Sequence, residues 1–319
     1  MKKFLFVKTS SMGDVIHHLP AITDTRRHHP DARITWLVEE PFAPLVRLHP
    51  AVDEVITVAV RRWRSHPFRA ATWREFSEAK ARLKASPFDR IIDAQGLIRS
   101  ALLVKLAHGE SHGYDAASIR EPVASWFYDV RHAVSRSLHA VDRNRQITAL
   151  SLGHAVDMPI DYGLPRSAPS GAAPYAVLLH GTSRASKEWR ESDWIRLGKF
   201  LREKGLDVLL TWGNEAERLR SQRLAGGIKG SRILPRQPLD ETAKVIAGAS
   251  LVVGVDTGLL HLAAAYQVPS LGLFLSTDPG LTRPVGAGPI KILGGRGVYP
   301  ECVDAMAASE ELLGGTGAA

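Results

Sequence analysis

The sequence contains a single cysteine, Cys302, among 319 residues. One thiol cannot form an internal disulfide or a cysteine-based metal cluster, and such usage is typical of a reducing compartment. Long apolar runs are also missing, because no stretch reaches the roughly 18 residues that a spanning helix requires. The apolar run in the opening MKKFLFVK is too short for a signal peptide and indicates a first strand. We therefore expect a cytoplasmic protein whose membrane contact is at most peripheral.

The excess of positive charge is small. The chain has 41 Lys and Arg against 33 Asp and Glu, which gives +8 overall, +5 before Pro165 and +3 after it. This balance permits an anionic partner, mainly on the first half, without indicating nucleic acid. The P-loop pattern, a dinucleotide G-x-G-x-x-G after the first strand, H-E-x-x-H and an Asp-x-Asp pair at a strand end are all absent. We therefore predict no cofactor and no metal, so that lysine, hydroxyls and helix amino ends neutralise any diphosphate.

Apolar strands alternate with amphipathic helices along both halves of the chain. This order predicts parallel sheets with helices on both faces. A segment rich in Pro, Gly, Ser and Ala, 161–174, has no periodicity and indicates a linker. We predict an α/β protein of two Rossmann-like, doubly wound domains, 1–165 and 166–319, facing a cleft. The expected strands are 4–7, 33–38, 52–58, 91–93, 175–179, 208–210, 233–234 and the two in 251–274; the expected helices start near 15, 73, 193, 214, 242 and 258, with a weakly helical tail at 305–313 near the linker.

The most informative stretch is Leu251–Phe274, LVVGVDTGLLHLAAAYQVPSLGLF. It predicts a buried strand, a polar turn, a helix and a second strand. In a parallel sheet the carboxyl end of a strand and the next helix start meet at the ligand crevice, and the helix dipole favours an anion there. The residues expected to face one bound anion, most plausibly a phosphate, are Asp256, Thr257, Gly258 and His261. The alternative is a capped helix with a buried histidine.

A carboxylate, Asp14, stands at the start of the helix that follows the first strand. Here it can act as a general base toward a hydroxyl group within hydrogen-bond reach. The alternative is an aspartate that caps the helix, which is the commoner use of such a position. The preceding Thr9, Ser10 and Ser11 offer hydroxyl and backbone donors.

A loop with hydroxyls, glycine and lysine, HGTSRASK at 180–187, follows the first strand of the second half. Such a loop can wrap a diphosphate, with Lys187 as a point charge for the leaving phosphate. The alternative is an ordinary solvated loop. At the next strand end, Glu217 in WGNEAE can hold a ribose through its hydroxyls, although a surface glutamate is the simpler interpretation.

Five arginines and three aromatic rings gather in 61–74, RRWRSHPFRAATWR. Arginine forks grip phosphates and carboxylates, and tryptophan prefers a water–lipid boundary. Arg99, Arg120 and Arg143 can extend the same face. The alternatives are a solvated loop with inward tryptophans, and single-stranded nucleic acid, which the mild charge disfavours.

Taken together, these motifs resemble the type I lipopolysaccharide heptosyltransferases of Gram-negative bacteria over nearly the whole chain. The segments that carry the resemblance are KTSSMGD at 8–14, RRWR at 61–64, IDAQGL at 92–97, REP at 120–122, HGTSRASKEW at 180–189 and VDTGLLHLAAA at 255–265. The resemblance implies a GT-B glycosyltransferase. Its second domain would bind ADP-L-glycero-β-D-manno-heptose, and its first would bind Kdo2-lipid A at the inner membrane surface. Heptose would pass to the inner Kdo with inversion and without a metal.

The same resemblance assigns residues to roles. Asp14 would be the base, and Gln237 in LPRQPL falls where the family contacts adenine. The donor site implied is Thr182, Ser183, Lys187, Glu217, Gln237, Asp256, Thr257, Gly258 and His261, and the acceptor site is Ser10, Ser11, Arg61, Arg62, Arg64 and Arg120. Because a fold does not fix a substrate, heptosyltransferase II, another GT-B nucleotide-sugar enzyme and a non-catalytic nucleotide-binding protein remain alternatives.

Overall fold

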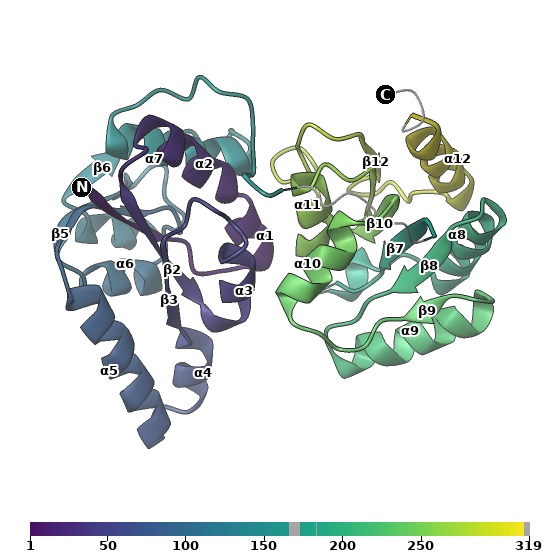
Figure 1. Cartoon of the computed structure of the whole chain (residues 1–319), viewed down its shortest axis with the longest axis horizontal. Coiled ribbons are helices and arrows are strands. Elements are labelled where there is room, and N and C mark those ends of the chain that lie inside the picture. The colour runs from purple at the N-terminus through teal and green to yellow at the C-terminus, as the bar shows by residue number, and fades with distance from the viewer. Residues whose placement is uncertain (166–172, 183, 316–319) are drawn as a thin grey trace. The chain divides into compact units, whose positions relative to one another are not determined.

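The computed structural model describes residues 1–165, 173–182 and 184–315 and divides the chain into two compact units. Unit 1 is Met1–Gly163 and unit 2 is Leu164–Ala319, so the division lies two residues before the expected boundary. Figure 1 shows a separate α/β sandwich for each unit. Each contains a six-stranded sheet in which every strand pair is parallel, which confirms the predicted fold class of two doubly wound sheets.

The sheet of unit 1 has the strand order β3-β2-β1-β4-β5-β6. The chain adds β2 and β3 on one side of β1 and then returns to place β4 on the other side, so the switch point lies between β1 and β4. The elements of unit 1 are β1 (Lys3–Val7), α1 (Met12–Ile16), α2 (Leu19–His28), β2 (Arg33–Glu39), η1 (Glu40–Phe42), α3 (Ala43–Val46), β3 (Glu54–Val58), α4 (Val60–Ser65), α5 (Ala70–Lys84), β4 (Phe88–Asp93), α6 (Ile98–Val104), β5 (Gly109–Tyr114), η2 (Pro122–Phe127), β6 (Val130–His132) and α7 (Ala140–Leu152).

Alternate residues of β1 face the two helix layers of unit 1. Leu5 and Val7 belong to a buried cluster with residues of α5 and α6, so these two helices cover one face of the sheet. Phe4 and Phe6 contact His29 and His18, at the two ends of α2, and α2 packs against α7. The period of two along the strand thus places α5 and α6 on one face and α2 and α7 on the other.

The sequence predicted one continuous helix after the first loop, and this prediction was wrong. The structure has α1 and α2 instead, separated at His17 and His18. Pro20 lies in the first turn of α2, where its missing N–H costs nothing, whereas an unbroken helix would need that donor. The sequence also missed β5, β6, α3, α4, α6 and α7 in this unit.

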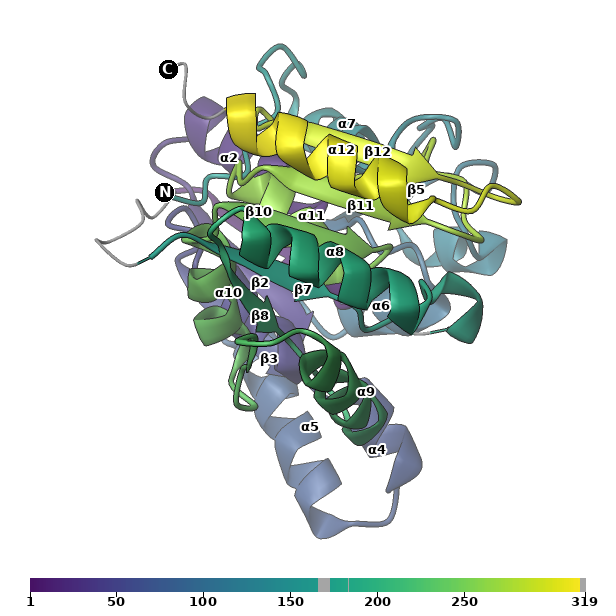
Figure 2. The same ribbon diagram turned by 90° about the vertical axis from the view of Figure 1, so that its right-hand side faces the viewer.

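The sheet of unit 2 has the order β12-β11-β10-β7-β8-β9, with its switch point between β7 and β10. Its buried core joins the strands to α8, α9 and α12. Helices α8 and α12 pack against each other, and Figure 2 shows them side by side over the sheet. The elements are β7 (Tyr175–Leu179), η3 (Ala185–Lys187), α8 (Glu191–Glu203), β8 (Asp207–Leu210), α9 (Glu215–Gly227), β9 (Arg232–Ile233), α10 (Leu239–Ala247), β10 (Leu251–Val255), α11 (Gly258–Ala265), β11 (Ser270–Phe274), β12 (Ile290–Gly294) and α12 (Cys302–Gly314).

The expected strands of unit 2 all form within a residue or two of their predicted bounds, and only β12 was missed. The tail, expected to be a weak helix near the linker, is a regular helix whose contacts are with α8 and the strands β10, β11 and β12. None of the helices in the described ranges is long and apolar enough to cross a membrane.

Candidate active site

Asp14 lies in the loop and helix that follow β1, at the switch point of the first sheet. It is the third residue of α1, and its Oδ2 accepts hydrogen bonds from the Ser11 amide at 2.7 Å and the Ser11 hydroxyl at 3.0 Å. Ser11 is therefore the N-cap, and Asp14 closes the box from inside the first turn rather than capping the helix itself. Both bonds end on Oδ2, the same one of the two carboxylate oxygens.

An open cavity of about 150 Å³ adjoins Asp14. Lys8 lines it, and its ammonium donates to the Ala94 carbonyl at 2.7 Å and to the Asn144 Oδ1 at 3.2 Å. Burial lowers the pKa of Lys8, and the nearby carboxylates of Asp14 and Asp93 oppose that shift. The cavity is lined by Lys8, Asp14, Ala94, Gln95, Tyr114, Arg120, Ala140, Arg143 and Asn144. Three cations around one carboxylate favour an anionic ligand.

Gln95, which follows β4, holds the loop that carries Asp14. Its Oε1 accepts from the amides of Thr9 and Ser10, each at 3.0 Å, across the switch point. Gln95 is in turn oriented by the buried Asp93, whose Oδ1 accepts from the Gln95 amide at 2.8 Å. Burial raises the pKa of Asp93, while a hydrogen bond from the Tyr128 hydroxyl at 2.7 Å acts against it. No role for these residues was predicted from the sequence, although an acid that ends an apolar strand was a signal for them.

The predicted acceptor residues occupy three different settings. Ser10 is buried and its hydroxyl accepts from Arg99 at 3.1 Å, whereas Ser11 holds Asp14. Arg120 lines the cavity beside Asp14. Arg61 and Arg64 are exposed on α4, while Arg62 pairs with Glu40 at 2.7 Å and Glu75 at 2.9 Å. The segment 61–74 is thus a helical hairpin rather than a loop, and Trp63 joins its two helices through a hydrogen bond to Glu75 at 2.8 Å.

In unit 2 the predicted donor residues gather at the carboxyl ends of neighbouring strands. Lys187, from the loop after β7, pairs with Asp256, which follows β10, at 2.5 Å. The same Asp256 oxygen accepts from the Thr277 hydroxyl at 2.9 Å. Both members of the pair are largely buried, with 16% and 13% of their side chains exposed. The pair therefore lies at the switch point of the second sheet, where a ligand crevice is expected.

The helix after Asp256 presents its amino end at the same place. Thr257 is the N-cap of α11 in an extended conformation, and its side chain makes no capping bond to the first turn. Gly258 opens the helix and His261 follows one turn later, buried with 5% exposed. Unsatisfied amides at such a helix start attract negative charge.

Several buried polar atoms have no hydrogen-bond partner within the described part of the chain. Among them are the Thr182 hydroxyl oxygen and the Gln237 side-chain nitrogen, both at positions predicted to contact the donor. Because buried polar groups in proteins are normally satisfied, these two atoms are free to bind a ligand at this edge. Ser183, also predicted there, lies outside the described residues.

Glu217 lies in the first turn of α9 and leans across the loop after β7. Its Oε2 accepts from the Gly213 amide at 2.7 Å, and Asn214 caps the helix by accepting from the Glu217 amide at 3.0 Å. A Cβ at Gly181 would stand 2.6 Å from the Glu217 carboxyl carbon. Gly181 is therefore required by the close approach of this carboxylate, which connects the loops after β7 and β8.

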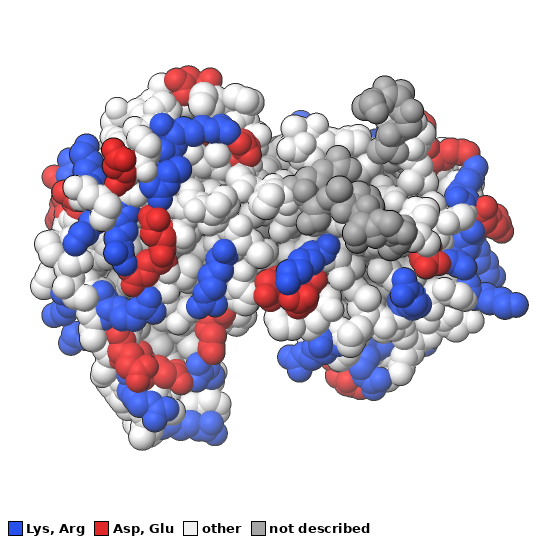
Figure 3. Space-filling view, viewed as in Figure 1, with Lys and Arg blue, Asp and Glu red and all other residues white. Residues whose placement is uncertain are grey.

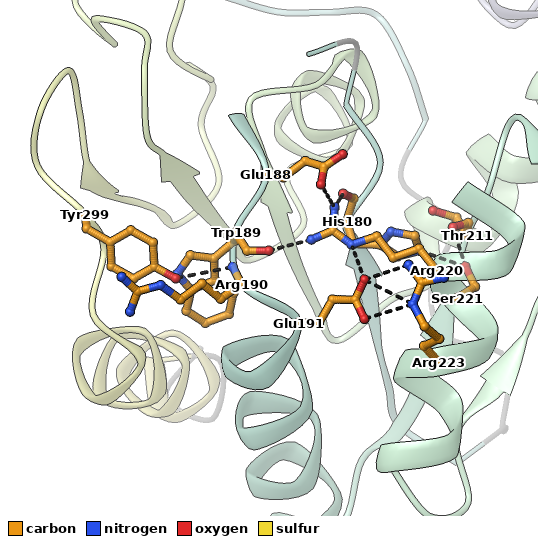
Figure 4. Close-up of polar contacts among 10 residues, drawn as sticks. All are labelled: His180, Glu188, Trp189, Arg190, Glu191, Thr211, Arg220, Ser221, Arg223 and Tyr299. Atoms are coloured by element: carbon orange, nitrogen blue, oxygen red, sulfur yellow. Dashed lines mark hydrogen bonds and ion pairs between the residues drawn. The ribbon is translucent and has the colours of Figure 1, made fainter. Parts of the chain in front are cut away.

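Arg220, one turn beyond Glu217 on α9, holds both ends of the loop that follows β7 and carries Lys187 (Figure 4). Its guanidinium donates to the His180 carbonyl at 3.5 Å, before the loop, and to the Trp189 carbonyl at 2.5 Å, after it. It also pairs with Glu188 at 3.0 Å. Of this helix, only Glu217 was singled out from the sequence. The spacing of three residues from Glu217 was the available signal, because such residues share a helix face.

Comparison with known proteins identifies relatives over most of the chain. A sequence model described as glycosyltransferase family 9 (heptosyltransferase) matches residues 77–308. Lipopolysaccharide heptosyltransferase 1 of Pseudomonas aeruginosa is 47% identical over 292 residues, which cover 89% of this chain and 81% of the relative. The protein of the same name from Salmonella typhimurium is 45% identical over 287 residues, covering 88% and 90%.

Solved structures give the same result. Escherichia coli heptosyltransferase WaaC with ADP superposes with a TM-score of 0.89 at 40% identity, covering 98% of this chain and 99% of that one. The same enzyme with ADP-2-deoxy-2-fluoro heptose gives 0.85 at 39% identity and equal coverage. E. coli ADP-heptose LPS heptosyltransferase II, at 19% identity and a TM-score of 0.79 with full coverage of both chains, shares the fold. The predicted GT-B architecture is confirmed.

Proposed function

Because this chain belongs to glycosyltransferase family 9, the heptosyltransferases, we propose that it transfers L-glycero-D-manno-heptose from ADP-heptose to the inner Kdo of Kdo2-lipid A. The enzyme class, a heptosyltransferase of lipopolysaccharide inner-core synthesis that uses ADP-heptose, follows from identities of 45% or more over most of the chain. The acceptor sugar, the stereochemistry and the residue roles are our proposal.

The donor binds to unit 2 in this proposal. Lys187 contacts the diphosphate, together with the Thr182 hydroxyl and Ser183, and the α11 amino end at Thr257 and Gly258 adds partial positive charge. His261 donates a hydrogen bond to the end of the donor where the phosphate joins the sugar. A carboxylate repels a diphosphate, so we assign Asp256 to the heptose hydroxyls, which can donate to it. The 2.5 Å contact between Lys187 and Asp256 supports these two assignments, because it holds the cation for the diphosphate next to the carboxylate that accepts hydrogen bonds from the heptose.

The nucleoside contacts follow from the neighbouring strand ends. Glu217 accepts from the ribose hydroxyls, and the unpartnered amide of Gln237 donates to an adenine ring nitrogen. These groups orient ADP as the leaving group. Lys187 also stabilises the negative charge that develops on the β-phosphate as the glycosidic bond breaks, and no metal is required for that role.

The acceptor binds to unit 1. We assign the Kdo carboxylates to the cavity beside Asp14, where Arg120 offers a guanidinium to them. The exposed Arg61 and Arg64, with Arg62, contact the lipid A phosphates. Because the acceptor is a membrane lipid, the protein works as a peripheral protein on the cytoplasmic face of the inner membrane.

The proposed chemistry is a single displacement. Asp14 removes the proton from the acceptor hydroxyl as its oxygen attacks the anomeric carbon, and ADP leaves from the opposite face. One base and no covalent intermediate give inversion. The observation that carries this role is the position of Asp14, which has one carboxylate oxygen fixed by Ser11 and lies on a cavity lined by cations.

The test is ADP release from ADP-heptose by the wild type and by Asp14→Ala, with and without Kdo2-lipid A. We expect release only with that acceptor, and a loss of at least about 100-fold in kcat for the variant, the size typical of a missing general base. ADP affinity should stay within about twofold, because Asp14 belongs to the acceptor unit. Normal turnover by Asp14→Ala would remove its role as base. ADP release with a different acceptor would reassign the acceptor substrate. If no acceptor caused ADP release, the chain would be a nucleotide-binding protein without transferase activity.

A further inference from the structure

We propose that α6 and η2 of unit 1 form a surface that inserts into the interface of an anionic phospholipid bilayer. This α6–η2 surface consists of Ile98, Leu102, Val123 and Trp126. The choice of a bilayer as the partner rests on the proposed lipid acceptor. The exposure of these four side chains is independent of that proposal.

The four side chains are exposed and adjacent. Ile98 is 38% exposed and Leu102 is 52% exposed, four residues apart on one face of α6. Val123 and Trp126 in η2 are 44% and 72% exposed. The two elements pack together, and the Ile98 amide donates to Glu121, just before η2, at 2.7 Å. Single exposed apolar residues are ordinary, but a contiguous group marks an interaction site.

Further exposed rings lie on and beside α5, which covers the same face of the sheet as α6. Phe68, between α4 and α5, is 97% exposed, and Trp73 on α5 is 61% exposed. Helices α5 and α6 share one buried cluster against the sheet, through Leu83 and Leu103 among others, so their outer faces belong to one side (Figure 1). Tryptophan and phenylalanine at this level fit the boundary between headgroups and acyl chains.

The charge on these helices complements anionic headgroups. The segment 60–84 has eight cations, Arg61, Arg62, Arg64, Arg69, Arg74, Lys80, Arg82 and Lys84, against Glu75 and Glu78. Acidic and basic side chains are interspersed over the face drawn in Figure 3, yet unit 1 keeps a net charge of +5. A basic residue near an anionic leaflet contributes about 1 kcal/mol, which is enough to orient this side toward it.

A bilayer fits this surface better than a protein partner because of its neighbour. Arg120 lines the cavity beside Asp14 and lies two residues before η2, so the chain leads from the cavity directly into the apolar surface. A lipid-anchored acceptor keeps its acyl chains in the bilayer while its sugar enters the cavity. The α6–η2 surface, next to that cavity, therefore contacts the membrane when the acceptor is bound.

The experiment compares vesicle binding of the wild type and the double variant Leu102→Gln/Trp126→Gln by co-sedimentation. Vesicles contain phosphatidylethanolamine with phosphatidylglycerol, or phosphatidylcholine alone, and no acceptor. We expect the affinity for the anionic vesicles to fall at least about tenfold. Burial of each of the two apolar side chains in the bilayer contributes about a factor of ten or more to that affinity in the wild type. The matched control, Leu150→Gln/Leu219→Gln, alters leucines that are 41% and 45% exposed on α7 and α9 and should bind as the wild type does.

The outcomes separate this inference from the proposed function. Turnover of a deacylated, soluble acceptor should be unchanged in the α6–η2 variant, which also shows that it folds. Equal vesicle binding by variant and wild type would overturn the inference, and so would loss of a dimer in sedimentation velocity, which would make the surface an interface between copies. Vesicle binding through this surface without any heptose transfer would refute the proposed function alone.

Discussion

Lys187 and Asp256 neutralise each other at 2.5 Å at the switch point of the second sheet. Removing the cation has two consequences. In the proposed donor site the diphosphate loses its point charge, and the carboxylate of Asp256 is left unopposed beside it. We therefore expect Lys187→Ala to raise the KM for ADP-heptose at least about tenfold and to lower kcat as well, because the same charge stabilises the leaving ADP.

The control for that change is Lys291→Ala, which removes a lysine paired with Glu311 on the surface of the same unit and should leave both constants unchanged. The double variant Lys187→Ala/Asp256→Asn distinguishes the two consequences. It should bind ADP more tightly than Lys187→Ala does, because the uncompensated carboxylate is gone. Calorimetric titration with ADP measures this, and equal affinities in the two variants would contradict the assigned repulsion.

At the scale of an element, α9 carries a proposed donor contact and supports the neighbouring loop. Its first turn carries Glu217, and Arg220 fixes the carbonyls of His180 and Trp189 at the two ends of the loop that carries Lys187. We expect Arg220→Met to raise the KM for ADP-heptose about tenfold or more while the acceptor KM stays unchanged, because only the donor loop loses its clamp. Steady-state kinetics with each substrate varied in turn measure this split.

The matched control lies one turn further on the same helix. Arg223 pairs with Glu191 at 2.7 Å but contacts neither loop carbonyl, so Arg223→Met should keep the wild-type donor KM. Arg220→Lys should restore part of the affinity, since it keeps the charge but loses the fork that reaches both carbonyls. If the Met and Lys variants changed only thermal stability, Arg220 would be structural and not a positioning residue.

The sequence predicted those elements whose own residues specify them. The stretch from β10 to β11 was predicted well because a wholly apolar strand, a turn and an apolar helix follow one another without interruption. β5 was missed because its sequence, GESHGY, is polar and does not alternate, and β6 is only three residues long. These strands form because β4 offers a paired edge, which is a property of the sheet and not of the segment.

The same distinction applies to the candidate site. Asp14, Lys187 and Glu217 could be singled out because each lies in the loop or the helix start that follows a strand, where side chains meet the crevice. For Gln95 and Arg220 the sequence carried only a local signal of position, because the partners that define their roles lie 86 and 31 to 40 residues away along the chain. Those roles depend on which strand ends become neighbours, so the folded arrangement was needed to assign them.

At the scale of the whole molecule, buried neutral histidines make both units sensitive to acid. In unit 1, His49 accepts from the Ala51 amide through Nδ1 at 3.2 Å and contacts the Thr23 hydroxyl through Nε2 at 3.0 Å. In unit 2, His180 is fully buried and contacts the Ser221 hydroxyl at 2.7 Å. Burial lowers the pKa of each to about 4, opposed by Asp161 at His49 and reinforced by Arg220 at His180.

These shifts set the direction of the pH dependence. Between a pKa of about 6.5 in the unfolded chain and about 4 in the folded one, the unfolded state binds more protons, so the free energy of unfolding falls as the pH is lowered through this range. At pH 5 each imidazole should cost on the order of 1 to 2 kcal/mol relative to pH 7.5. Urea unfolding at the two pH values measures this loss, and His49→Gln should reduce it, whereas His108→Gln, at an exposed position, should not. A free energy of unfolding that stayed constant between pH 7.5 and 5 would contradict the lowered pKa values of His49 and His180. With those values, both imidazoles bind protons in the unfolded chain but stay neutral in the folded one.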